Sequence, residues 1–299
     1  MHSVHEEILA FIDDERRDTF EALALRVFAH QFDSIEPYRL FCTARNRTPS
    51  TVSDWQQIPP VPIQAFKQLD LRCGTPQRIF LSTGTTQGAE RRSRHCLPDL
   101  RLYHRSAIGG LRSFLLPDVE RIRIISLVPP VARCPDSSLA QMVAWAMEHF
   151  GDEGSGYAVG DTGVEWDCLV EALRGAEHTG RLCCLMTTTA ALLRVFDHVR
   201  DRRLSFRLPH GSRLMDTGGE KGLLRRLSRS GVLHAVWNTF AIPGYFCVNE
   251  YGMTELSSQY YDNVIAHRFS GRYAKRFKTG PHWVRTLVLA PGSLRPVPA

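Results

Sequence analysis

The feature that most constrains the fold is a repeated order: a short apolar segment, a turn of small or hydroxyl-bearing residues, then a segment with helical periodicity. This order begins at Arg121, Arg181 and Ser212, and a further apolar segment at 244–251 leads into a glycine turn. Apolar strands that alternate with amphipathic helices are typical of an α/β domain with largely parallel strands. We therefore predict mixed or parallel sheets that are flanked by helices.

The polar turns of this chain follow its apolar segments. They lie at 82–88, 187–190, 216–220 and 251–257. Because ligands of α/β domains bind at the loops beyond the carboxyl ends of the strands, these turns predict one shared site. The threonines at 187–189 have two interpretations: they line the substrate site, or they form an ordinary turn at the end of a strand.

The N-terminal region, residues 4–45, has the periodicity of helices. Phe20, Leu23, Val27 and Phe28 recur at helical spacing and form one apolar face. We interpret such a face as core rather than as a ligand site. The chain is predicted to be one large domain, 1–299, with a helical part at 1–55, an α/β core at 56–244 and a β-rich end at 245–299.

Composition excludes several classes of protein. The net charge is +6 and is distributed along the chain, so neither a basic arm nor a nucleic-acid module is indicated. No apolar run is long enough to span a membrane, and the acidic N-terminus is not a signal peptide. The eight cysteines lack the spacing of a zinc site or disulfide scaffold, which favours free thiols in the cytoplasm. The neighbours His95 and Cys96 are interpreted as packing or surface residues.

The loop "STGTTQG", which comprises Ser82, Thr83, Gly84, Thr85, Thr86 and Gly88 with Gln87, has the composition of an anion-binding turn. Glycines bring backbone N–H groups close to a ligand, and hydroxyl groups donate to phosphate oxygens. The loop does not match the P-loop pattern, because no lysine follows its last glycine. Taken alone, a loop of this composition is more often a polar surface turn than a ligand site.

A second motif, "YGMTEL" at 251–256, changes this interpretation. A hydroxyl- and glycine-rich loop after an early strand, followed much later by "YGMTE" after a late strand, resembles the adenylate-forming enzymes. The segments "PPVPIQAFK", "PDSSLAQM", "LMDTGGEKG" and "YGMTELSSQYYD" further resemble the acyl-protein synthetase family of the LuxE type. The resemblance extends from about residue 55 to the end. The phenylacetate–CoA ligase group is the nearest alternative.

This resemblance implies a large adenylate-forming domain that uses ATP and Mg²⁺. It assigns the phosphates of ATP to the loop that contains Ser82 and Gly88. It assigns the edge of the adenine pocket to Gly218, Gly219 and Glu220, and the face of the adenine ring to Tyr251. Within the same motif, Gly252 and Met253 belong to the nucleotide site. Thr254 would contact the α-phosphate, and Glu255 would bind Mg²⁺, a cation that prefers carboxylate and phosphate oxygens.

The resemblance also implies the reaction. A fatty or other apolar carboxylic acid would be converted to acyl-AMP with release of pyrophosphate, and the acyl group would pass to a thiol of a protein, a carrier protein or CoA. A homo-oligomer is possible.

The sequence departs from the superfamily in two respects. Arginines replace the lysine that usually follows the loop. The abrupt end "PVPA" predicts that the small C-terminal domain, with its catalytic lysine and an acyl-accepting cysteine, is absent. If the natural chain is this short, a non-catalytic nucleotide- or acyl-binding subunit is the alternative.

Overall fold

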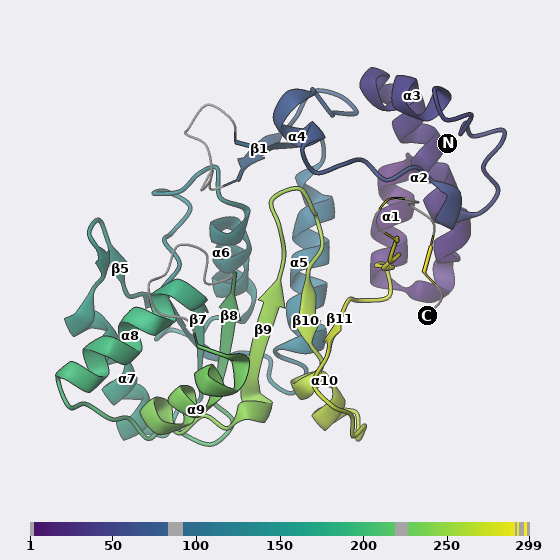
Figure 1. Ribbon diagram of the computed structural model, residues 1–299. Helices are drawn as coiled ribbons and strands as arrows, with labels where there is room; N and C mark the ends of the chain where they lie inside the picture. The colour runs from purple at the N-terminus through teal and green to yellow at the C-terminus, as the bar shows by residue number, and fades with distance from the viewer. Residues whose placement is uncertain (1–2, 83–91, 219–226, 291, 293–295, 298–299) are drawn as a thin grey trace. The chain divides into compact units, whose positions relative to one another are not determined.

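A computed structural model of the chain describes residues 3–82, 92–218, 227–290, 292 and 296–297 (Figure 1). The chain divides into two compact units. Unit 1 contains Met1–Gly109, Met253–Ser258 and Gly280–Ala299, and unit 2 contains Gly110–Gly252 and Gln259–Thr279. These boundaries differ from the division into 1–55, 56–244 and 245–299, which stays a prediction.

Unit 2 is built on a sheet that, in the described part of the chain, has seven strands in the order β11-β10-β9-β8-β7-β3-β4. The strands are β3 (Arg123–Ser126), β4 (Gly156–Tyr157), β7 (Cys183–Thr188), β8 (Arg213–Thr217), β9 (Cys247–Tyr251), β10 (Tyr260–Asp262) and β11 (Lys278–Thr279). Neighbours from β4 to β9 are parallel, whereas β10 and β11 are antiparallel to their neighbours. The predicted α/β class is therefore confirmed, and the strands within 245–279 continue the same sheet (Figure 1).

Helices connect the parallel strands, because a crossover between parallel strands needs a dozen or more residues and is usually a helix. They are α6 (Ser138–Phe150), α7 (Trp166–Thr179), α8 (Thr189–Asp201) and α9 (Arg229–Phe240); α10 (Val264–Phe269) follows β10, and η4 (Gly244–Phe246) precedes β9. The short strands β5 (Val159–Gly160) and β6 (Gly163–Val164) form a separate hairpin. The hydroxyl of Ser137 caps α6 by accepting a hydrogen bond from the Ala140 N–H at 3.2 Å.

The burial of the strands in unit 2 explains why their sequences are continuous apolar runs. All five residues of β8 and the first five of β7 are buried, because helices cover a parallel sheet on both faces. One exception to the apolar core is Arg213, whose side chain is fully buried. Its guanidinium donates to both carboxylate oxygens of Asp118, at 2.6 and 3.0 Å, and to the carbonyls of Leu115 and Gly211. These bonds satisfy the buried charge.

Unit 1 begins with helices α1 (Val4–Asp13), α2 (Phe20–Ser34) and α3 (Glu36–Thr43), which confirms the predicted helical character of 4–45. The short helix η1 (Glu15–Arg17) lies between α1 and α2, and η2 (Trp55–Gln57) and α4 (Ala65–Gln68) follow α3. Helix α5 (Leu100–Phe114) begins in this unit. A small core forms around Phe28, Ile35 and Tyr38. The hydroxyl of Thr19 caps α2 by accepting a hydrogen bond from the Ala22 N–H at 3.2 Å.

Unit 1 also contains a two-stranded antiparallel sheet of β1 (Arg78–Leu81) and β2 (Arg94–Leu97). The predicted strand before the "STGTTQG" loop is therefore present. This strand pairs with β2, however, and is not a strand of the seven-stranded sheet. No helix among the described residues has the length and hydropathy needed to cross a membrane.

Candidate functional site

The carboxyl ends of β7, β8 and β9 lie side by side in unit 2. The register pairs Thr188 with Thr217, and Thr217 with Glu250. Three of the four predicted turns, those after 187, 216 and 251, therefore start at one edge of the sheet, where ligands of α/β domains bind. The fourth turn follows β1 in unit 1.

Asp216 is the centre of a buried polar cluster at this edge and is 1 % exposed. Its carboxylate accepts hydrogen bonds from the Thr189 hydroxyl at 3.0 Å, the Asn249 amide at 2.9 Å and the Arg229 guanidinium at 2.7 Å. Thr188 caps α8 by accepting a bond from the Ala191 N–H at 3.1 Å. These contacts give Thr188 and Thr189 a structural role, which agrees with the interpretation of 187–189 as a strand-end turn.

Glu250 is buried beside this cluster and accepts a hydrogen bond from the Thr217 hydroxyl. Burial raises the pKa of Glu250 to about 7, although the Thr217 bond and the charge of Lys278 act in the opposite direction. Glu250 also explains the glycine of the "YGMTE" motif. A Cβ atom at Gly252 would lie 2.5 Å from Oε1 of Glu250, so the backbone passes too close to this carboxyl group for a larger residue.

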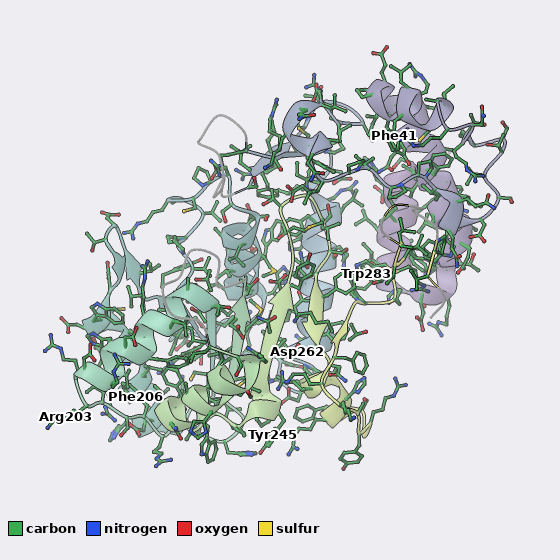
Figure 2. The ribbon with its side chains drawn as sticks, in the orientation of Figure 1. Phe41, Arg203, Phe206, Tyr245, Asp262 and Trp283 are labelled. Atoms are coloured by element: carbon green, nitrogen blue, oxygen red, sulfur yellow. The ribbon has the colours of Figure 1, made fainter. Side chains whose placement is uncertain are left out.

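Asp262 on β10 forms the second acidic centre of unit 2 (Figure 2). It accepts from the Asn249 N–H at 3.0 Å and from the Lys278 ammonium at 3.1 Å, and it also pairs with Arg276. Burial alone would raise the pKa of Asp262, but the Asn249 bond and the charges of Lys278, Arg276 and Arg229 outweigh it and hold the pKa below its ordinary value. Lys278 thus anchors β11 to β9 and β10, because its ammonium also donates to the Asn249 carbonyl at 2.6 Å.

Two predicted adenine-site residues end neighbouring strands. Gly218 follows β8 with a φ of +82°, a left-handed conformation that favours glycine, and its carbonyl accepts a bond from the Thr189 hydroxyl at 3.0 Å. Tyr251 ends β9, pairs in register with Tyr260, and is half exposed. An exposed aromatic face at this edge is suited to a nucleobase. Gly219 and Glu220 lie outside the described residues.

In unit 1, the β1–β2 hairpin holds the base of the "STGTTQG" loop. The hydroxyl of Ser82 accepts a bond from the Ser93 N–H at 2.9 Å, and the Ser82 N–H donates to the Ser93 carbonyl at 3.0 Å. Arg92 donates to the carbonyls of Ser82 and Leu81. Arg92 therefore fastens the hairpin. Thr83, Gly84, Thr85, Thr86 and Gly88 lie outside the described residues.

The same hairpin contacts the "YGMTE" segment through His95. Nδ1 of His95 donates to the Thr254 carbonyl at 2.7 Å. Burial lowers the pKa of His95, and neither the Thr254 bond nor the negative charge of Glu255 fully offsets this effect. His95 is thus a neutral donor that positions Thr254. The sequence interpretation treated His95 as a packing or surface residue, because a lone histidine on a strand carries no signal for a partner 159 positions away.

Glu255 and His95 both line a cavity of about 480 Å³ in unit 1. Met253 and Leu256 form the turn that presents Glu255, since the Leu256 N–H donates to the Met253 carbonyl at 3.0 Å. Within the described residues, no group of three or more acidic, cysteine or histidine side chains could hold a metal ion by itself. Mg²⁺ in nucleotide sites uses one or two carboxylates together with phosphate oxygens, and a single carboxylate that faces a cavity fits this requirement.

The cysteines are free thiols, and all eight lie in described residues. Burial raises the pKa of Cys183 to about 11 and that of Cys184 and Cys247 to about 12. These three thiols are protonated at neutral pH and are poor nucleophiles.

The fold of this chain resembles that of an adenylate-forming ligase. The structure is similar to 2-hydroxyisobutyryl-CoA ligase in the postadenylation state in complex with 2-HIB-AMP, with a TM-score of 0.54 and 11 % sequence identity. The likeness covers 84 % of this chain and 54 % of that enzyme, so the chain spans about half the length of the ligase. At 11 % sequence identity, this likeness is evidence for a shared fold alone.

The sequence places the chain within a family. The model of the family described as "Acyl-protein synthetase, LuxE" matches residues 4–299, and the chain belongs to this family. The predicted resemblance, which extended from about residue 55, is confirmed and includes the N-terminal helices. No curated protein matches the chain.

Proposed function

We propose that this chain activates an apolar carboxylic acid with ATP and that the acyl group then passes to a thiol. A carboxylate oxygen attacks the α-phosphorus, the bond between the α-phosphorus and the bridging oxygen breaks, and pyrophosphate leaves. The product is acyl-AMP. A thiolate then attacks the acyl carbon, and AMP leaves. The observation that supports this proposal best is the His95–Thr254 hydrogen bond, because it joins the hairpin of the hydroxyl-rich loop to the "YGMTE" segment.

Thr254 and Glu255 would act where charge accumulates. We assign the α-phosphate to the Thr254 hydroxyl and, when Mg²⁺ is bound, the cation to the Glu255 carboxylate. Mg²⁺ would supply charge neutralisation on the phosphates. The protein's part is to hold donors in place before the reaction, and a neutral His95 that fixes the Thr254 backbone serves this purpose. In unit 2 we assign the adenine ring to Tyr251 and Gly218, which end adjacent strands.

The acceptor is a thiol outside the buried cysteines of the described chain, because Cys183, Cys184 and Cys247 are too deeply buried and too weakly acidic to act. CoA, a carrier protein and a protein cysteine are the three candidates. A cytoplasmic location, a homo-oligomeric state and the lack of nucleic-acid binding stay predictions.

Incubation with ATP, Mg²⁺, hydroxylamine and a panel of carboxylic acids tests the proposal. We expect hydroxamate and pyrophosphate to appear only with an apolar acid. Glu255→Gln should lower the rate roughly a hundredfold or more, the effect of removing one group that stabilises transition-state charge. Glu171→Gln, at an exposed position on α7, is the matched control and should retain the rate.

The outcomes separate the alternatives. Tight ATP binding without acid-dependent turnover would support a non-catalytic subunit. Acyl-CoA formation when CoA replaces hydroxylamine would support a CoA ligase of the phenylacetate type. Full activity of the Glu255→Gln variant, with an unchanged circular dichroism spectrum, would exclude Glu255 as the metal ligand.

A further inference from the structure

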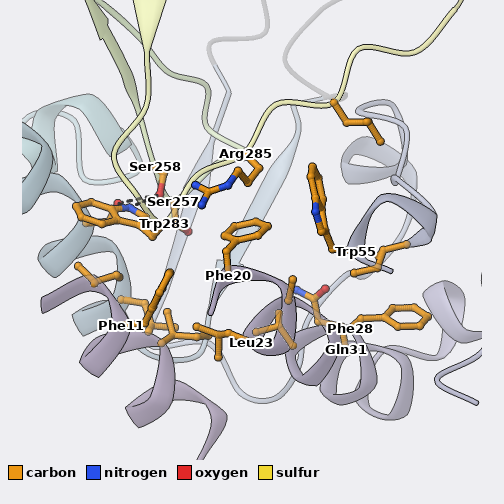
Figure 3. A pocket seen from close by; sticks show the side chains of 18 of the residues that line it. Phe11, Phe20, Leu23, Phe28, Gln31, Trp55, Ser257, Ser258, Trp283 and Arg285 are labelled. Carbon is orange, nitrogen blue, oxygen red and sulfur yellow. Dashed lines mark hydrogen bonds between the residues drawn. The ribbon is translucent and has the colours of Figure 1, made fainter. Parts of the chain in front are cut away.

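The apolar face of α2, which the sequence predicted to be core, lines a cavity of about 570 Å³ in unit 1 (Figure 3). Figure 3 shows Phe11, Leu23 and Phe28 along one side of this cavity and Trp55 and Trp283 at opposite ends. Its lining is apolar except for Gln31, Arg285 and three serines. A cavity of this size holds one small-molecule ligand, and its apolar walls exclude nucleotide phosphates, which need cations and donors.

Most polar side chains of this cavity form hydrogen bonds with other residues of the protein. Nε1 of Trp283 donates to the hydroxyls of Ser106 and Ser258, at 3.0 and 3.1 Å, and these hydroxyls bond to each other at 2.8 Å. The guanidinium of Arg285 lies 4.6 Å from the centre of the Phe20 ring and donates to the carbonyls of His282 and Val284. The Trp283 indole is thus held in place as a wall that presents its apolar rings.

The cavity adjoins the one that contains Glu255. Six residues line both cavities: Ile8, Val27, Gln31, Ile58, Leu102 and Ser257. Ser257 follows Glu255 by two positions, and Glu255 and His95 line the second cavity only. An occupant of the apolar cavity could therefore extend past Gln31 and Ser257 and place one end beside Glu255.

We propose that this cavity binds the hydrocarbon tail of the carboxylic acid and that α2 sets the accepted chain length. The inference rests on the proposed function and adds where the substrate lies: the tail would lie between Trp55 and Trp283, and the carboxylate would reach the cavity that Glu255 lines. Phe20 and Ala24 on α2 are the specificity-determining residues. Ala24 leaves space because its side chain is one carbon, and Phe20 fills space under Arg285.

The test measures kcat/KM for saturated acids from butanoic to hexadecanoic acid, followed by acid-dependent pyrophosphate release. Each methylene that enters an apolar cavity should raise kcat/KM by about fourfold until the cavity is full. Ala24→Phe should lower the ratio of kcat/KM for tetradecanoic over hexanoic acid roughly tenfold or more. Phe20→Ala should move the optimum to longer acids, in the opposite direction. Glu21→Phe, which adds the same ring at an exposed position of α2, is the matched control and should leave the ratio unchanged.

Displacement of the fluorescent fatty acid cis-parinaric acid, without ATP, gives a second readout that does not need turnover. Wild type and Glu21→Phe should bind this probe, and Ala24→Phe should bind it about tenfold more weakly. If acids are activated but Ala24→Phe and Phe20→Ala leave the chain-length optimum unchanged, the assignment of the cavity is overturned and the proposed function stands. If no acid is activated, the proposed function fails. In that case, weaker binding of the probe to Ala24→Phe than to wild type still supports the assignment of the cavity to a hydrocarbon tail. Equal binding to the two proteins overturns that assignment.

Discussion

The interiors of the two units differ in polarity. Unit 2 buries charge: Asp216, Asp262 and Glu250 lie at the ends of its strands, and hydrogen bonds and arginines satisfy them. Unit 1 contains an apolar cavity, which residues of α2 and Trp283 line together with few polar groups. The difference indicates that the sheet edge provides fixed positions for polar chemistry, whereas the helices provide a volume whose size can change by single substitutions. Removal of one hydrogen-bonding or ion-pair partner should therefore lower the free energy of unfolding more in unit 2 than in unit 1.

The largest expected effect comes from Asp216→Ala. It removes the acceptor of three hydrogen bonds and leaves Arg229, among the described residues, with a longer contact to Asp262 at 3.4 Å. Loss of one partner from a buried ion pair costs about 3–5 kcal/mol of unfolding free energy, which urea denaturation would measure. Asp161→Ala removes a pair with Arg133 whose acidic side chain is 89 % exposed, and it should cost less than about 1 kcal/mol. Equal losses in the two variants would show that burial of the Asp216 cluster does not make its ion pair more important for stability than an exposed pair of the same unit.

A second effect should appear in the pH dependence of stability. The pKa of Glu250 is about 7 in the folded chain and 4.5 in the ordinary case, so the folded protein keeps this proton when the unfolded chain has lost it. The contribution of Glu250 to stability is therefore greatest below pH 4.5 and decreases as the pH rises to about 7, by roughly 3 kcal/mol. Glu250→Gln keeps an acceptor for Thr217 and should remove this decrease.

The measurement is the difference in unfolding free energy between wild type and Glu250→Gln across this pH range. The variant should be the more stable of the two above pH 7, and the difference should shrink toward acidic pH. Glu171→Gln should follow the wild type throughout. A difference that stays constant with pH would mean that Glu250 keeps an ordinary pKa despite its burial.

A smaller effect, confined to unit 1, is expected for His95→Phe. The Thr254 carbonyl loses its donor, and an unsatisfied buried group costs about 1–3 kcal/mol. If His95 positions Thr254 for the α-phosphate, kcat/KM for ATP should fall roughly five- to 150-fold. His95→Asn, which offers an amide donor, should recover part of this loss. Because His95 acts as a neutral donor, its replacement by asparagine should leave the pH profile of kcat/KM unchanged; a shifted profile would instead indicate a proton-transfer role.

The smallest effect is expected for Trp283→Phe. The ring remains as a cavity wall, and Ser106 and Ser258 keep the hydrogen bond to each other, so only the indole N–H bonds are lost. The expected cost is about 1 kcal/mol of unfolding free energy. Trp237→Phe, on the exposed side of α9, is the matched control. A loss from Trp283→Phe as large as that from Asp216→Ala would show that unit 1 depends on polar pairing as strongly as unit 2.

Much of unit 2 could be predicted from the sequence, because its signals are local. Apolar runs such as 183–186 predict buried parallel strands, and Ser137 and Gly151 mark the two ends of α6. The placement of Gly218, Tyr251 and Gly252 at strand ends follows from the same pattern. The role of Glu250 could not be predicted, since its burial depends on the neighbouring strand that carries Thr217.

Unit 1 was harder to predict because its signals are not local. An apolar helix face looks the same in a sequence whether it packs against core or lines a cavity. Phe20, Leu23, Val27 and Phe28 all line the cavity, and Phe28 also packs in the small core. The contact between His95 and Thr254 joins residues far apart in the chain. The assignment of 253–258 and 280–299 to the unit that holds the N-terminal helices likewise depends on tertiary contacts alone.

The discontinuous composition of unit 1 has a consequence for how the protein is made. Its helices precede unit 2 in the chain, but the cavity wall that contains Trp283 and Arg285 follows unit 2 and is synthesised after it. Unit 2, apart from the six-residue interruption at 253–258, is translated almost continuously in between and can complete its sheet earlier. The apolar side of α2 therefore remains without this wall while unit 2 is translated, and we expect a chaperone to bind the helix during that interval.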